Sequence, residues 1–161
     1  MKLRPYKREN AETILSWCAE ERAFYKWTAG VMGNYPITVV EFQFVEKVTA
    51  FCAYDGEEPV GFFTLRYPHE SKEELRFGFV IVNPEKRGMG YGREMLRLGL
   101  EYAFSQPGVK IASLGVFENN MSARRCYQAA GFQDTGKVHF VKFPTISEEW
   151  KCLELEIGSE Q

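Results

Sequence analysis

The sequence has no long hydrophobic run, no excess of one charge and no closely paired cysteines. No stretch approaches the roughly 20 consecutive apolar residues that a membrane-spanning helix needs, so we expect no membrane partner. The N-terminal segment MKLRPYKREN carries charges without a following apolar segment, unlike a secretory signal. Together these absences predict a cytoplasmic protein.

Charge and cysteine content exclude further classes of protein. Twenty Lys and Arg against 22 Asp and Glu give a net charge of -2, too balanced for non-specific binding to nucleic acid. The four cysteines are scattered without a CxxC pair, which disfavours a disulfide framework or a zinc site. We therefore expect no metal, no nucleic-acid partner and reduced, mostly buried thiols at Cys18, Cys52, Cys126 and Cys152.

The sequence also lacks internal repeats, low-complexity tracts and Pro/Gly/Ser-rich linkers. Its 161 residues, 45% hydrophobic and 26% charged, suit one soluble globular domain with a sizeable core. We therefore predict a single domain over residues 1–161.

The first third of the chain is predicted to be mostly helical after a short strand at residues 2–6. Asn10 is a candidate N-cap for a helix that extends as far as Glu21, with regularly spaced residues along one side. A second helical segment follows it. Thr38 and Glu41 have the spacing of a capping box and open a third segment.

From Val48 the pattern changes to that of strands. The segments VTAFCAY and PVGFFTLRY flank a DGEE turn, which predicts an antiparallel hairpin. The next segment, EELRFGFVIV, alternates along its length. Its predicted core face holds Leu75, Phe77, Phe79 and Ile81, and its second face, a candidate site, holds Glu74, Arg76, Gly78, Val80 and Val82.

The remaining elements alternate between helices and strands. Residues 90–106 have one apolar side typical of a helix, and KIASLGV is a predicted strand. Asn119 or Asn120 caps a further helix that Gly131 stops. Two final strands are predicted around 135–142 and 150–157.

A glycine-rich turn between a strand and a helix is the most informative segment. In VIVNPEKRGMGYGREML, a β-branched run ends at Asn83, and three glycines then lead into a helix: Gly88, Gly90 and Gly92. Glycines allow left-handed backbone angles, so successive amides converge on phosphate oxygens at the positive end of the helix. Arg87 adds a fixed positive charge. The segment predicts a phosphate-binding loop, although the same glycines would also suit a plain tight turn.

Two other phosphate loops fit this spacing badly. The dinucleotide motif GxGxxG needs a glycine where the chain has Arg93, and the acidic residue expected about twenty positions later is missing. The Walker motif GxxxxGK[ST] is absent, which disfavours ATP with magnesium. A nucleotide-dependent oxidoreductase therefore stays as a weaker alternative.

Two motifs resemble those of the GCN5-related N-acetyltransferase (GNAT) family. Its acetyl-CoA loop reads [QR]xxGx[GA], and Arg87, Gly90 and Gly92 fill the three defined positions. Its second signature, NxxAxxxYxxxGF, is matched by Asn120, Ala123, Tyr127, Gly131 and Phe132. The resemblance covers most of the chain and is weakest before Val48. The layout is similar to the branch that includes ribosomal-protein N-terminal acetyltransferases.

The resemblance implies an α/β (α+β) single-domain GNAT-like fold. Its central sheet is mixed, mostly antiparallel and twisted, is flanked by helices and holds the cofactor in a splayed strand pair. Residues 1–47 would form a helical acceptor-side region, 48–142 the cofactor-binding core and 143–161 a C-terminal strand.

The resemblance also implies the site residues. Acetyl-CoA would bind along the splayed strand, on the loop and at the second motif, through Val80, Ile81, Val82, Arg87, Gly88, Met89, Gly90, Tyr91, Gly92 and Asn120. Tyr127 matches the family tyrosine that protonates the departing thiolate, although its place on an apolar helix stripe also suits a core residue.

The general base is not carried over by the resemblance, because relatives place a catalytic glutamate at positions that are here Arg76, Phe77 and Gly115. Glu74 and Glu118 are the candidates that remain, each with the alternative of a solvated carboxylate. We take Glu74 as the candidate base. No histidine lies near Cys126 in sequence, and neither His69 nor His139 shows a partner spacing, which disfavours a cysteine nucleophile.

The sequence therefore predicts an acetyl-CoA-dependent N-acetyltransferase that acts on a primary amine. The acceptor is either a protein or peptide N-terminus or a small-molecule amine, and a homodimer is open. Glu20 and Glu21 are candidates for binding a cationic amine, or else form an exposed helix face. The alternative from another class is a non-catalytic acyl-CoA-binding sensor.

Overall fold

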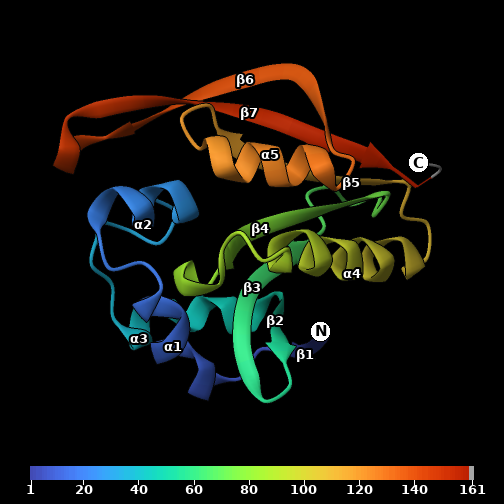
Figure 1. The fold of residues 1–161 in the computed structure, drawn as a ribbon. Helices are drawn as coiled ribbons and strands as arrows, with labels where there is room; N and C mark the ends of the chain where they lie inside the picture. Colours follow the sequence, from blue (N-terminus) through green and yellow to red (C-terminus); the bar gives the residue numbers. More distant parts are fainter. Residues whose placement is uncertain (160–161) are drawn as a thin grey trace.

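A computed structural model describes residues 1–159. Seven strands in this part of the chain form one sheet of order β1-β2-β3-β4-β5-β7-β6, drawn as arrows in Figure 1. Neighbouring strands are antiparallel except β4 and β5, which are parallel. The strands are β1 (Lys2–Pro5), β2 (Thr49–Asp55), β3 (Glu58–Arg66), β4 (Glu74–Val82), β5 (Ile111–Phe117), β6 (Gln133–Phe143) and β7 (Glu148–Gly158). The mixed, mostly antiparallel sheet confirms the predicted fold class.

Three short helices follow β1: α1 (Ala11–Ser16), α2 (Glu21–Thr28) and α3 (Val39–Phe42). The predicted single helix from Asn10 to Glu21 is wrong, because α1 ends at Ser16 and Glu21 begins α2. The Asn10 side chain is engaged elsewhere, since its Nδ2 donates to Tyr54 Oη at 2.9 Å. The capping box of α3 is confirmed, with Thr38 and Glu41 bonded reciprocally.

Two longer helices lie further along the chain, α4 (Tyr91–Ser105) and α5 (Met121–Ala129), and both were predicted. Asn120 caps α5, because its Oδ1 accepts a hydrogen bond from Ala123 N at 3.4 Å. No helix in the described part of the chain is both long and apolar enough to cross a membrane.

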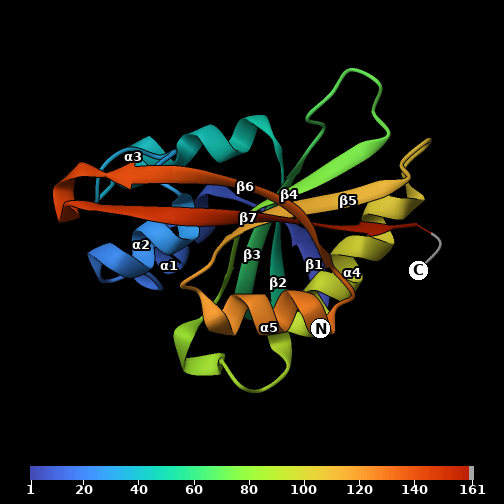
Figure 2. The same cartoon turned by 90° about the horizontal axis from the view of Figure 1, so that it is seen from above.

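The two faces of the sheet carry separate cores. The α4-side core combines buried residues of α4 and α5 with strand residues such as Phe63, Leu114 and Leu155. The α2-side core combines buried residues of α1, α2 and α3 with Phe62, Phe117 and others. Figure 2 shows α1 to α3 gathered at one end of the molecule and α4 towards the other.

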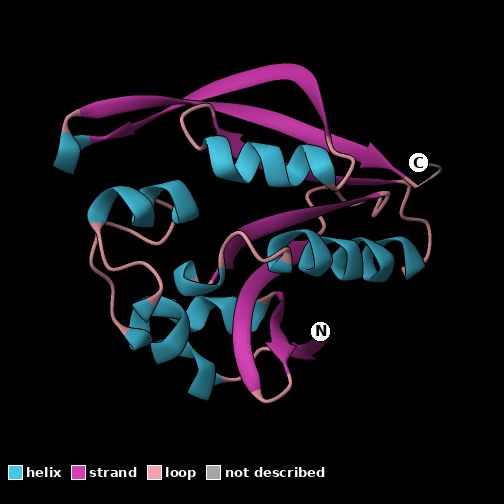
Figure 3. Ribbon diagram, in the orientation of Figure 1, coloured by secondary structure: helices cyan, strands magenta, loops and turns pink. Residues whose placement is uncertain are grey.

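The hairpin of β6 and β7 extends beyond the other strands and covers α2. Figure 3 shows this long ribbon running across the molecule, with its tip above the short helices. Contacts at the tip fix α2, because the Tyr25 ring stacks on Phe143 at 4.8 Å and Arg22 pairs with Glu148. The C-terminal strand predicted from 143 to 161 begins at Glu148 as β7, and positions 160–161 lie outside the described residues.

A bulge in β4 reverses its alternation of side chains. Its pairing with β3 shifts register near Phe79, which has a left-handed φ of 51°. Leu75 and Phe77 belong to the α4-side core. Phe79 and Ile81 pack in the α2-side core. The prediction that all four share one face is wrong, because one extra residue in a bulge moves every later side chain to the opposite face.

Candidate active site

A cleft opens where β4 and β5 separate. The two strands are paired at Glu74–Ile111, Leu75–Ala112 and Arg76–Ser113, and they diverge beyond that last pair. The opening leads into a cleft of about 500 Å³. Its strand walls come from residues 77–82 of β4 and 114–116 of β5. The splayed strand pair expected from the sequence is therefore present.

The cleft passes through the sheet from one face to the other. On the α4 side it is lined by the loop before α4 and by residues of α5 such as Ala123 and Tyr127. On the α2 side it is lined by Cys18, Ala23 and Trp27. Because both sides contribute walls, two ligands are able to meet in the gap between the strands.

The loop between β4 and α4 ends on a helix N-terminus. Asn83 Oδ1 accepts a hydrogen bond from Glu85 N and starts a single turn of 3-10 helix. Gly88 and Gly90 then have left-handed φ angles of 78° and 83°, which strongly favour glycine. The first backbone bond of α4 runs from Glu94 N to Gly90 O. The preceding amides are therefore the unpaired donors of a helix start, which bind anions well.

Gly92 is a glycine for another reason, the close approach of neighbouring side chains. A Cβ there would lie 3.1 Å from Cys126 Sγ and 3.5 Å from Val82 Cγ2. The adjacent Tyr91 donates a hydrogen bond to Asp55, the last residue of β2. This bond attaches the start of α4 to the edge of the hairpin.

The charge of the cleft is strongly positive. Among the described residues, Glu20 is the one acidic side chain that lines it, against five cationic ones: Arg22, Lys26, Lys86, Arg87 and Arg93. Arg22 pairs with Glu148, and Lys86 Nζ lies 3.5 Å from Glu58 Oε2. An excess of cations over anions in a concave site attracts a polyanionic ligand.

The cysteines of the cleft are not set up as nucleophiles. Burial raises the pKa of the Cys18 thiol to about 11, an effect that the charge of Arg87 partly opposes. Burial also raises the pKa of Cys126, with Arg93 acting in the opposite direction. Both groups are neutral thiols near pH 7, and neutral thiols are poor nucleophiles. Cys18, Cys52 and Cys152 are buried and Cys126 is half-buried, which confirms that the thiols are mostly buried, and their reduced state stays a prediction.

Tyr127 lies on the wall of the cleft that α5 contributes. Its side chain is 7% exposed, and its ring packs edge-on against Phe132 with centroids 6.3 Å apart. Burial raises the pKa of the Tyr127 phenol, so the hydroxyl keeps its proton throughout the neutral range. The structure thus gives Tyr127 both of its predicted environments, a packed ring and a place in the cleft.

The bulge residue Phe79 connects the cleft to α2. Its carbonyl accepts a hydrogen bond from Trp27 Nε1 at 2.8 Å. The Phe79 ring packs edge-on against Trp27 and Phe44. Because Trp27 and Phe79 both line the cleft, the contact holds its α2 side against the irregular part of β4.

Most of the predicted site residues come together here. The cleft is lined by ten of them: Val80, Ile81, Val82, Arg87, Gly88, Gly90, Tyr91, Gly92, Asn120 and Tyr127. Met89 does not line it and is 63% exposed. The other exception is Glu74, the candidate base.

Glu74 lies away from the cleft. Its Oε2 accepts a hydrogen bond from Ser113 Oγ at 2.7 Å, and its Oε1 lies 3.7 Å from His69 Nε2. The prediction that Glu74 shares a strand face with Val80 and Val82 is wrong, because the bulge at Phe79 lies between them. Glu118, the second candidate, pairs with Lys151 at 3.6 Å and does not line the cleft either.

An ion pair beside the splay was not foreseen from the sequence. Arg76 Nη1 donates to Glu154 Oε2 at 2.7 Å, and Arg76 Nη2 donates to Oε1 at 3.0 Å. The pair spans β5, where Gly115 leaves room for it. No local pattern joins residues 78 positions apart, so this contact could be found only from the order of the strands in the sheet.

Comparison with known proteins decides the family. The acetyltransferase (GNAT) family matches residues 15–132, which is most of the chain. The chain belongs to the GNAT family. The predicted resemblance is therefore confirmed, and its placement near the ribosomal-protein branch stays a prediction.

Several GNAT proteins are similar to this chain. An uncharacterized N-acetyltransferase of Bacillus subtilis, YycN, is 36% identical over 70 residues, which are 44% of either chain. A second from the same organism, YfmK, is 35% identical over 52% of this chain. The chain thus spans about half the length of these two relatives, 44% and 53%.

Longer matches extend the comparison. Aminoglycoside N(6')-acetyltransferase type 1 of Klebsiella pneumoniae is 27% identical over 151 residues, 88% of this chain and 73% of that protein. The solved structure of Vibrio cholerae spermidine N-acetyltransferase, in complex with CoA and spermine, superimposes with a TM-score of 0.79. It covers 99% of this chain and 95% of its own at 16% identity, which supports the GNAT fold assigned above.

Proposed function

We propose that this GNAT protein is an acetyl-CoA-dependent N-acetyltransferase that transfers an acetyl group to a small-molecule primary amine. The observation that carries the proposal is the cleft through the sheet, which joins a glycine loop on a helix N-terminus to the gap between β4 and β5. One end of this cleft suits a diphosphate, and the other end is open to a second substrate.

The residues present fit coenzyme A. The amides of the 87–92 loop lie at the start of α4, where an anion would bind, and Arg87 and Arg93 add positive charge beside them. The unpaired edge of β4 at Val80, Ile81 and Val82 offers backbone groups to an extended, amide-containing arm. Asn120 lines the cleft and caps α5 with its Oδ1, so its Nδ2 is not used by the cap and can serve as a donor.

Acetyl-CoA supplies a thioester, whose carbon an amine attacks directly. For that reaction the protein positions both partners, and Tyr127 supplies a proton to the thiolate that leaves. Burial raises the pKa of this phenol, so the hydroxyl is protonated and able to donate when the thiolate develops. We call the sheet face that carries α2 the acceptor face, because the pyrophosphate loop occupies the opposite side.

The proposed acceptor class follows from the relatives. The similar proteins include an aminoglycoside acetyltransferase and a spermine/spermidine acetyltransferase, which are named for small polyamines or amino sugars. A peptide N-terminus is the other acceptor that we considered, and no relative described above is named for one. The homodimer and a cytoplasmic location stay predictions.

Release of CoA from acetyl-CoA tests the proposal. Spermidine, kanamycin and a short peptide with a free N-terminus serve as acceptors, and calorimetry measures the binding of acetyl-CoA alone. We expect micromolar binding and turnover with spermidine or kanamycin. Turnover with the peptide, and with neither spermidine nor kanamycin, would show that the acceptor is a peptide N-terminus instead. Binding without turnover on any acceptor would overturn the proposal in favour of an acyl-CoA sensor.

A further inference from the structure

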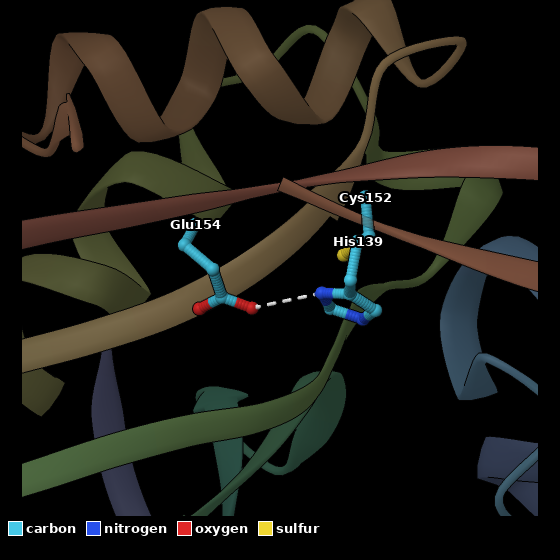
Figure 4. Close-up of side chains that lie close together, drawn as sticks. All are labelled: His139, Cys152 and Glu154. Atoms are coloured by element: carbon cyan, nitrogen blue, oxygen red, sulfur yellow. Dashed lines mark ion pairs between the residues drawn. The ribbon is translucent and has the colours of Figure 1, made fainter. Parts of the chain in front are cut away.

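A histidine, a cysteine and a carboxylate come together on the acceptor face. Figure 4 shows His139 of β6 pointing toward Glu154 of β7, with Cys152 beside them. Their side-chain N, S and O atoms lie within 4.8 Å of one another. His139 is opposite Cys152 in the β6–β7 ladder, and Cys152 belongs to the α2-side core. The group therefore lies on the same face as α2.

Gly115 connects this group to the cleft. It lines the cleft and is paired with Glu154 in the β5–β7 ladder. A Cβ added at Gly115 would lie 3.1 Å from Cys152 Sγ, 3.4 Å from Glu154 Oε1 and 3.0 Å from Arg76 Nη2. Cys152, Glu154 and Arg76 thus lie directly over the strand that borders the splay, whereas His139, Cys152 and Glu154 do not line the cleft themselves.

Two members of the group are already engaged. Both oxygens of Glu154 accept hydrogen bonds from Arg76, at 2.7 and 3.0 Å. Burial raises the pKa of the Cys152 thiol to about 11, with Glu154 acting in the same direction and Arg76 against it. Cys152 is therefore a neutral thiol near pH 7, and Glu154 is paired with the Arg76 guanidinium.

His139 differs from Cys152 and Glu154 because its imidazole ring has two nitrogens, and only one of them, Nδ1, faces Glu154. Its Nδ1 lies 3.6 Å from Glu154 Oε1, and its side chain is 54% exposed. A carboxylate beside Nδ1 favours the tautomer with the proton on Nδ1, which leaves the Nε2 lone pair to accept another proton. The charged or titratable groups that face it are Glu154 and Cys152 of β7 and Arg76 of β4, while β5 contributes the uncharged Gly115.

We propose that His139 is the proton acceptor for the incoming amine and that Glu154 is its positioning residue. This inference rests on the proposed function and names the base for that reaction. Histidine suits the role because a neutral imidazole has one ring nitrogen with a lone pair that can accept a proton. The predicted base, Glu74, is instead paired with Ile111 where β4 and β5 are still joined, and its side chain is bonded to Ser113.

The protons and bonds of the reaction balance. The ammonium group of the acceptor loses one proton through water to His139 Nε2, because His139 lies outside the cleft lining, and the neutral nitrogen attacks the thioester carbon. The C–N bond forms and the C–S bond breaks, and Tyr127 protonates the leaving sulfur. The second proton lost by the nitrogen returns through solvent to the Tyr127 oxygen. His139 then releases its proton to solvent, so one proton is released for each acetyl group transferred.

The same three residue types are also zinc ligands. Two features of the chain disfavour a metal site. The Arg76 guanidinium occupies both oxygens of Glu154, and the Cys152 sulfur is a buried neutral thiol that would have to lose its proton. A cation bound to Glu154 would lie next to the positive charge of Arg76.

The pH profile of kcat/KM for spermidine tests the proposal, with kanamycin replacing spermidine if only kanamycin is turned over. In the wild type we expect kcat/KM to level off at a lower pH than in His139→Gln, because the protein accepts the proton of an amine that is still charged. In His139→Gln we expect a loss of about 100-fold at pH 7. Its rate should keep rising with pH until the amine deprotonates in solution.

His69→Gln is the matched control, because His69 is the second of the two histidines and pairs with Glu74 instead. This control should keep the wild-type profile. Free imidazole should restore part of the activity of His139→Ala and none to the Tyr127→Phe variant. A wild-type pH profile in His139→Gln, or no rescue of His139→Ala, would overturn the inference while leaving the proposed function intact.

A measurement without cofactor gives a second readout. Nitrogen chemical shifts in the protein alone should report the proton of neutral His139 on Nδ1, and Glu154→Gln should reduce the population of this tautomer. A proton on Nε2 in the wild type would contradict the inference. Absence of turnover in the wild type would instead contradict the proposed function, so the two failures are distinguishable.

Discussion

At the scale of single residues, Tyr127 combines a packing role with a chemical one. Its ring is buried against Phe132, and the residue lines the cleft. Tyr127→Phe keeps the ring and removes the proton donor. We expect nearly unchanged binding of acetyl-CoA and a fall in kcat of about 10- to 100-fold, measured by CoA release.

Tyr102→Phe is the control for this substitution. Tyr102 lies on α4 with its ring packed edge-on against Phe51 at 4.9 Å, outside the cleft. Removal of the Tyr102 hydroxyl should therefore leave kcat unchanged. An unchanged kcat in Tyr127→Phe across the pH range would remove Tyr127 as the acid.

Tyr6 is a residue whose hydroxyl disturbs the core. Among the described residues, its Oη is the buried side-chain oxygen without a hydrogen-bond partner. The ring packs edge-on against Phe42 and Phe62, at 5.8 and 5.6 Å. Tyr6→Phe keeps these contacts, so we expect the free energy of unfolding at pH 7 to rise by about 1 kcal/mol. Urea denaturation measures it, and a loss of stability would show that the hydroxyl is solvated or bonded.

The same residue predicts a pH dependence. Burial and the charge of Glu46 raise the pKa of Tyr6 to about 12 from the ordinary value of 10. The folded state therefore holds this proton more tightly than the unfolded chain. Its contribution is complete below pH 10 and is lost as the pH rises through about 12. The melting temperature of Tyr6→Phe should thus fall less steeply than that of the wild type between pH 10 and 12.

At the scale of elements, the loop before α4 depends on backbone angles rather than side chains. Gly88 has a φ of 78° with no atom within 4 Å of an added Cβ. Gly88→Ala therefore meets no clash, and its effect is to move the loop away from its left-handed angle. We expect the Kd for acetyl-CoA to rise at least 10-fold, measured by calorimetry.

Gly136 provides a matched control in β6. Its φ is 82°, and an added Cβ there also has nothing within 4 Å. Gly136→Ala should lower stability by about as much as Gly88→Ala, near 1 kcal/mol, without changing the Kd. Equal binding by both variants would contradict the assignment of the 87–92 loop to the diphosphate.

Elements with strong local signals were predictable. The glycine loop, the capping box at Thr38, the cap at Asn120 and the β2–β3 hairpin each depend on residues close together in sequence. The bulge at Phe79 had no such signal, because a run of alternating apolar residues looks the same with or without one extra position. This is why the face of Glu74 was assigned wrongly.

At the scale of the whole molecule, the cleft joins the two cores. Both the α4-side core and the α2-side core contribute walls, so a ligand in the cleft contacts residues from either side of the sheet. Acetyl-CoA at 100 times its Kd should stabilise the folded state by about 2.7 kcal/mol. For a domain of this size we expect a rise in melting temperature of roughly 5–10 °C in a single transition.

Acetyl-pantetheine, which lacks the diphosphate, is the control for this shift. It should raise the melting temperature much less at the same concentration, because it cannot contact the start of α4. Two separate transitions, one of them insensitive to acetyl-CoA, would show that the two cores unfold independently. An equal shift with acetyl-pantetheine would show that the diphosphate contributes little.

The overall fold could be predicted from the sequence, whereas the contacts on the acceptor face could not. Two motifs in the right order indicated the family and therefore the sheet and the splay. His139, Arg76 and Glu154 come from three different strands, and neither their spacing nor the composition of the chain predicts that they are in contact. Contacts of this kind follow from strand order, which the family resemblance implies only in outline.

The irregular step in β4 makes the length of this strand matter more than its composition. Leu75 and Phe77 fill one core and Ile81 fills the other, so any apolar side chain of similar size should be accepted at each place. Deletion of one residue between Phe77 and Ile81 would exchange the partners of every position that follows. We therefore expect β4 to tolerate apolar substitutions but not the insertion or deletion of a residue.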